Sequence, residues 1–135
     1  MNESDELLST FGIIPPTEKR QEILALLLKE IDNEDSESNE YLKTLCILLF
    51  SIGNVQDAIN IWKAKSKNFD AGAYIDVQLL VGAGLDETKA YLLSVDDRNA
   101  KEAYDYLIKC EKSGDFIDFN NDKYLESIKR YFRVE

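Results

Sequence analysis

Residues 42–62 read LKTLCILLFSIGNVQDAINIW, and this stretch decides the fold class. Its first half is apolar on nearly every side of a helix, which predicts a central, buried helix over about residues 39–52. Gly53 supplies the left-handed conformation in which many helices end, and Asn54 is well suited to cap the next helix. The second half again has apolar residues at helical spacing. The stretch therefore predicts two helices joined by a tight turn.

The same pattern, a run of helical apolar spacing followed by a glycine, recurs along the chain. Gly84 and Gly114 follow Gly53 at intervals of 31 and 30 residues, and each ends another apolar run. A repeat period in the thirties is typical of stacked pairs of helices. The three glycines therefore favour a stack of helix–turn–helix units.

We predict an all-α fold of six or seven helices, arranged as antiparallel hairpins in a single domain of residues 1–135. Residues 1–15 form a leading segment with a short turn that Ser4 caps, and residues 16–135 form the hairpins. The short alternating segment 115–119 is interpreted as a loop whose aromatic side chains hold it to the helices. The helices begin near Pro16, Asn39, Asn54, Asn68 or Asp70, Asp86, Asp96 or Asp97, and Asn120 or Asn121. The fourth runs to Gly82 and Gly84, with Ala73, Tyr74, Val77, Leu80 and Val81 facing inward.

The stretch from Leu42 to Trp62 resembles one tetratricopeptide repeat. That family has a large apolar residue, then Leu-Gly three and four positions on, and another apolar residue three later. These places are held here by Leu42, Leu45, Cys46 and Leu49. The family then has a turn glycine followed by Ala-x3-Phe, and Gly53 is followed here by Ala58-x3-Trp62. The resemblance implies stacked helical hairpins that bind other proteins.

The resemblance covers one unit of the chain well and the others weakly. In the register of Gly84 the small-residue position holds Lys89, and in the register of Gly114 it holds Phe119. HEAT-like packing or an irregular arrangement of helical pairs fits the later units as well. The tetratricopeptide-like prediction thus rests mainly on Gly53, Ala58 and Trp62.

The net charge of −10 argues against nucleic acid and against an anionic membrane surface as partners, because both need a basic surface. The charge is uneven: residues 1–40 contain eleven acidic and three basic residues, a net charge of −8, and the remainder carries −2. Such a field serves solubility, or it attracts a basic partner. For the second case we predict that the acidic loop after the first long helix makes the contact, through Glu34, Asp35 and Glu37.

The chain contains no histidine, which removes the common catalytic triads and the usual general base at neutral pH. Cys46 and Cys110 lie on apolar helical faces and are interpreted as buried structural residues, with Cys110 the more exposed. Glu37 stands where an EF-hand loop needs glycine, so no calcium site is predicted. Adjacent aspartates such as Asp96 and Asp97 are typical of helix caps. We therefore predict no catalytic residue, no metal and no cofactor.

The acidic N-terminal segment is not a signal peptide, and no apolar run approaches the length of a membrane span, so we expect a cytoplasmic protein. The predicted function is non-catalytic protein binding, as a scaffold or adaptor, with exposed parts of the second and fourth helices lining the surface. A first alternative is an immunity or antitoxin-like protein that neutralises a basic toxin. A second is an enzyme of unrecognised type.

Overall fold

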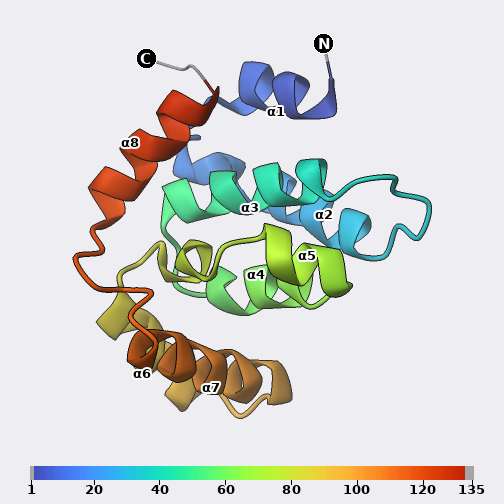
Figure 1. The fold of residues 1–135 in the computed structure, drawn as a ribbon. Coiled ribbons are helices and arrows are strands. Elements are labelled where there is room, and N and C mark those ends of the chain that lie inside the picture. The colour runs from blue at the N-terminus through green and yellow to red at the C-terminus, as the bar shows by residue number, and fades with distance from the viewer. Residues whose placement is uncertain (1, 133–135) are drawn as a thin grey trace.

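The structure is a computed structural model that describes residues 2–132. The described residues form helices and no strand, which confirms the predicted all-α class (Figure 1). The α-helices are α1 (Glu3–Phe11), α2 (Arg20–Ile31), α3 (Glu40–Ile52), α4 (Asp57–Lys65), α5 (Phe69–Tyr74), α6 (Leu85–Ser94), α7 (Arg98–Lys112) and α8 (Asn121–Phe132). Two short 3-10 helices, η1 (Thr17–Lys19) and η2 (Val77–Val81), complete the set.

The leading segment contributes a full helix, α1, where the sequence predicted only a short turn. Asn2 caps α1, because its side chain accepts a hydrogen bond from the backbone N–H of Asp5 at 2.8 Å. Ser4, the predicted cap, is instead buried, and its hydroxyl lies 3.0 Å from that of Thr44 in α3. The leading segment therefore packs on the central helix.

The helices lie in successive layers around α3 (Figure 1). α1 packs on α3, α2 packs against both α3 and α4, and α4 also contacts α7. α6 and α7 pack together at the end of the molecule opposite α1, and α8 runs along one side from the α7 end back toward α1. The described ends of the chain, in α1 and α8, thus lie at the same end of the molecule.

The core is centred on α3, as its apolar sequence predicts. Leu42, Leu45, Leu48 and Leu49 are each at most 1% exposed. Gly53 ends the helix in the left-handed conformation (φ 79°), and its backbone N–H donates to the carbonyl of Leu49 at 3.1 Å. The predicted turn after Gly53 is therefore present, but Asn54 does not cap α4: its side chain accepts from the backbone N–H of Gln56 at 2.9 Å, and α4 begins three residues later, at Asp57.

The predicted fourth helix is wrong, because the chain leaves the helical conformation after Tyr74. Ile75 is extended (φ −90°, ψ 113°), and η2 follows in place of a continuing helix. The buried ammonium of Lys65 in α4 donates to the carbonyls of Gly72 and Ile75, which supplies a partner to backbone groups at the end of α5. Ala73 and Tyr74, predicted to face inward, are exposed, and Ala71 and Ile75 are buried instead.

The end of α3 meets the turn before α6 backbone to backbone. A Cβ atom on Gly82 would lie 2.6 Å from the carbonyl oxygen of Phe50, so only glycine allows this approach. Asn121, at the start of α8, donates from Nδ2 to the carbonyl of Gly82 at 3.1 Å. Gly84 has a φ of 102° and immediately precedes α6, so it begins the fifth predicted helix, and no helix ends at it.

One ion pair is buried between α2 and α4. The guanidinium of Arg20 donates from Nε and Nη2 to the two carboxylate oxygens of Asp57, both at 2.8 Å. Asn60 donates to the same carboxylate at 2.9 Å. Asp57 is 1% exposed, so this fork joins the beginnings of two helices inside the core.

Candidate functional site

Acidic side chains gather on one surface, which is formed by α1, the loop before α3, the start of α3, and α5. Three adjoining grooves of 250, 410 and 480 Å³ cross it: the first two share Glu3 and Tyr41, and the last two share Glu37 and Ser38. Among the described residues no lysine or arginine lines these grooves. The carboxylates that line them are Glu3, Glu6, Glu30, Asp35, Glu37, Glu40 and Asp70, and we call this surface the acidic face.

Hydrogen bonds give the loop of the acidic face a defined conformation. The carboxylate of Glu30 accepts from the hydroxyl of Ser36 at 2.7 Å and from the side chain of Asn33 at 3.1 Å. The side chain of Asn33 in turn accepts from the backbone N–H of Asp35 at 3.0 Å. Lys67 donates to the backbone carbonyls of Glu30 and Asn33, at 2.8 and 2.9 Å, where α2 ends. The exposed carboxylates therefore project from a loop that is anchored at its base.

The negative field of the acidic face acts on a tyrosine within it. Burial raises the pKa of Tyr41, and the charges of Glu3, Glu30 and Glu6 raise it further. Lys43, in the first turns of α3, lines a separate groove beside α8, and its ammonium lies 4.6 Å from the ring centre of Tyr74. The nearest ammonium groups, those of Lys67 and Lys43, thus lie at the base and at the edge of the acidic face and do not line its grooves.

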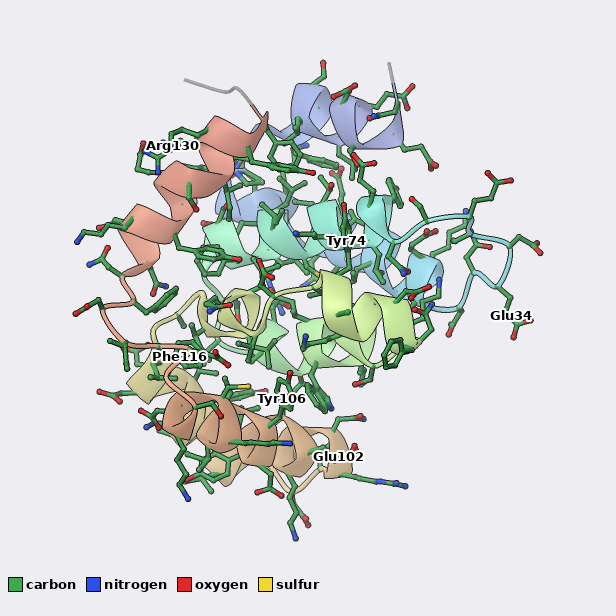
Figure 2. The ribbon with its side chains drawn as sticks, viewed as in Figure 1. Glu34, Tyr74, Glu102, Tyr106, Phe116 and Arg130 are labelled. Atoms are coloured by element: carbon green, nitrogen blue, oxygen red, sulfur yellow. The ribbon has the colours of Figure 1, made fainter. Side chains whose placement is uncertain are left out.

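The largest of the three grooves lies between residues 37–40 and α5, and we call it the α5 groove. Glu37, Glu40 and Asp70 line it, and none of their carboxylates forms an ion pair within residues 2–132. Tyr74 forms part of its wall and lies at the end of α5 that is next to α3 (Figure 2). The groove therefore lies between the second and fourth predicted helices, which were expected to line a binding surface.

The predicted contact residues do not all reach the grooves. Asp35 and Glu37 line them, whereas Glu34 lies at the outer end of the loop and points away from the body of the protein (Figure 2). Sequence reasoning did not select the other members, Glu3, Glu6, Glu30, Glu40 and Asp70. Four of them lie in residues 1–40, where the concentration of acidic residues could have indicated them. Asp70 comes from a distant segment, and no sequence pattern pointed to it.

The residues predicted to shape the hairpins occupy structural positions. Ala58 is 2% exposed in α4, and Gly114 follows α7 with a φ of 91°. Trp62 packs against Tyr106 of α7, with ring centres 5.2 Å apart, and Tyr106 rises from α7 toward α4 (Figure 2). The indole N–H of Trp62 is buried and has no hydrogen-bond acceptor among residues 2–132. The tetratricopeptide resemblance stays a prediction.

The residues considered as candidates for catalysis or metal binding are buried or serve as helix caps. Cys46 and Cys110 are both buried, and burial raises the pKa of each thiol, which disfavours the reactive thiolate. Asp97 caps α7 by accepting from the backbone N–H groups of Asn99 and Ala100. In the part of the chain that the structure describes, no group of three or more candidate ligands is placed to hold a metal ion.

Comparison with known proteins gives no match: no family model matches the chain, and neither a curated protein nor a solved structure is significantly similar to it. None of the helices within residues 2–132 has the length and apolar character needed to cross a bilayer. The function is therefore inferred from the geometry and charge of the acidic face.

Proposed function

We propose that this chain is a non-catalytic, cytoplasmic protein-binding domain whose acidic face takes a basic surface of a partner protein. The single observation that carries the proposal is the set of three adjoining grooves lined by seven carboxylates and by no basic side chain of residues 2–132. Concentrating like charges in this way costs folding free energy. A basic partner would relieve that repulsion on binding.

The anchored loop supports a role in binding. Most of its side chains face water, so the core gains little from its conformation. The hydrogen bonds of Glu30 and Lys67 nevertheless hold it beside α5. A loop held in this way loses less conformational entropy when a partner binds. An immunity protein that covers a basic toxin would use the same face, and the identity of the partner would decide between adaptor and immunity functions.

The proposal is tested by capture of partners from the native host with three forms of the protein. The first is the parent, and the second is the face variant Glu3→Gln/Asp35→Asn/Glu37→Gln. The third is a control with the same charge, Glu87→Gln/Asp105→Asn/Asp118→Asn, whose substituted residues are exposed and outside the acidic face. We expect a protein retained by the parent and by the control, and lost with the face variant.

The association rate of that partner should fall as salt is added, since the Debye length shrinks to about 10 Å at 0.1 M. The face variant should associate more slowly than the control even at low salt. A set of captured proteins that is the same for all three forms would contradict the proposal and reduce the acidic face to a solubility feature.

A further inference from the structure

We infer that the α5 groove is the anchor point of the acidic face, and that it holds a short partner segment in which arginine stands next to a large apolar side chain. This inference rests on the proposed function and adds the chemistry of the segment that binds. It draws on two independent features, the unpaired carboxylates of the groove and the exposed ring of Phe69 beside it.

Helical spacing brings the apolar and acidic groups of α5 to one surface. Phe69 and Ala73 are four residues apart on α5, as are Asp70 and Tyr74, so each pair forms a stripe along the helix. Ala73, Asp70 and Tyr74 line the groove. Phe69 is not one of its lining residues, but it lies one helical turn before Ala73 and so stands beside the groove. α5 thus presents an apolar stripe and an acidic–aromatic stripe side by side.

Phe69 has no partner within the described part of the chain. Its side chain is 90% exposed. It is the first residue of α5, which Asn68 caps by accepting from the backbone N–H of Ala71. A single exposed apolar residue is ordinary, but this one lies one helical turn from Ala73, in the wall of a 480 Å³ groove in which Tyr74 is also 37% exposed. An apolar side chain of a partner would cover the ring and remove it from water.

The charges of the groove specify the other half of the segment. Glu37 and Glu40 come from the chain before and at the start of α3, and Asp70 faces them from α5. Arginine suits this arrangement better than lysine, because its planar fork binds carboxylates through two hydrogen bonds and stacks on tyrosine. The ammonium of Lys43 lies 4.6 Å from the centre of the Tyr74 ring, so a partner arginine can stack only on the other face of that ring. A second copy of this chain is a poorer occupant, because two molecules of charge −10 repel each other.

The test uses two short peptides of equal length and charge, each labelled with an uncharged fluorophore. One alternates arginine with leucine, and the other alternates arginine with glycine. Fluorescence anisotropy at low salt measures their affinity for the full chain. We expect the arginine–leucine peptide to bind more tightly, by about tenfold or more, because only its side chains can cover Phe69.

Variants of the groove separate its two contributions. Glu37→Gln/Glu40→Gln/Asp70→Asn should weaken both peptides, whereas Phe69→Ala should weaken the arginine–leucine peptide alone. Leu93→Ala is the matched control for the exposed ring, because Leu93 is 66% exposed on α6, away from the acidic face. The control of equal charge is again Glu87→Gln/Asp105→Asn/Asp118→Asn. All of these positions are exposed except Glu40, which is half-buried, and circular dichroism checks that each variant is folded.

The possible results distinguish this inference from the proposed function. Equal binding of the two peptides, with no effect of Phe69→Ala, would overturn the inference, while loss of both peptides with the face variant would leave the proposed function in place. The inference would also be overturned if the groove variants bound the peptides as tightly as the parent does, or if neither peptide bound measurably. Sedimentation of the parent is run in parallel. A dimer that the groove variants abolish would assign the groove to a second copy and overturn the inference.

Discussion

Replacing Gly82 by alanine would force the end of α3 away from the turn that precedes α6. The new Cβ would lie 2.6 Å from the carbonyl oxygen of Phe50, 3.1 Å from its Cα and 3.2 Å from its carbonyl carbon. Ordinary contacts of this kind begin near 3.4 Å, so the two backbones must separate by about 0.8 Å. All three atoms belong to the backbone, so no side-chain rotation relieves the overlap.

The expected cost of Gly82→Ala follows from this overlap. Overpacking of a dense core costs about 1–3 kcal/mol, and a contact with rigid backbone belongs at the upper end of that range. Alanine also lowers the entropy of the unfolded chain, which returns about 0.4–1 kcal/mol because Gly82 has ordinary helical dihedral angles (φ −56°). We therefore expect a net loss of about 2 kcal/mol in the free energy of unfolding, or a fall of roughly 6–10 °C in Tm.

Urea denaturation followed by far-ultraviolet circular dichroism measures this loss, and Gly72→Ala is the matched control. Gly72 lies within α5, and a Cβ there would meet its nearest atom, the carbonyl oxygen of Lys65, at an ordinary 3.4 Å. The control should be neutral or stabilising by up to about 1 kcal/mol. If Gly82→Ala is as stable as Gly72→Ala, the backbone contact between α3 and the turn before α6 does not exist.

Substitutions at three other residues test separate contacts. Lys65→Met leaves the carbonyls of Gly72 and Ile75 without their buried donor and should cost about 1–3 kcal/mol in urea denaturation, whereas a neutral result would show that the ammonium lies in water. Trp62→Phe keeps a ring against Tyr106 and removes an unpaired N–H, so its Tm should stay close to that of the parent, while Trp62→Ala should lose about 2–4 kcal/mol. Burial, with the carboxylate of Asp76, raises the pKa of Tyr124 above its ordinary value of 10.0. The stability that the neutral Tyr124 hydroxyl contributes is therefore fully present below that ordinary pKa, and it is lost as the pH rises through the raised pKa of the folded state. Tyr124→Phe should therefore lose less stability than the parent in urea titrations at about pH 10–12, and equal losses would contradict the raised pKa.

Helices and their ends could be predicted from the sequence wherever the cause is local. The apolar run of α3 and the left-handed Gly53 after it follow from spacing and from the conformational freedom of glycine. The cap at Asp97 follows in the same way, because a short side chain satisfies the first N–H groups of its own helix. These features depend on residues within one or two helical turns, which a sequence displays directly.

The remaining features depend on groups that are distant in the chain. The break after Tyr74 involves Lys65, whose side chain sits between α4 and the end of α5, and no local pattern shows that contact. Gly82 was interpreted as a helix end, and it does follow η2, but it also lets the backbone of α3 approach, which no local pattern shows. The α5 groove likewise needs Asp70 to face Glu37 and Glu40 across 30 or more residues of sequence. Such pairings are set by the packing of the whole chain.

The buried fork between Arg20 and Asp57 has a consequence for the way the protein opens and closes. Burying the Asp57 carboxylate, which is 1% exposed in the native state, without its partner Arg20 would cost a large desolvation free energy. We therefore expect α4 to dock only together with the beginning of α2. The two partners are 37 residues apart, and α3 lies between them in the chain. We therefore expect α2, α3 and α4 to form one cooperative unit in native-state hydrogen exchange, with amide protons that exchange only when all three helices unfold together. α8 donates hydrogen bonds from Asn121 and Tyr124 to Val81, Gly82 and Asp76, which lie outside this unit, and touches α3 where the ring of Tyr124 meets that of Phe50. Its amides should therefore exchange earlier, at a lower free energy of opening.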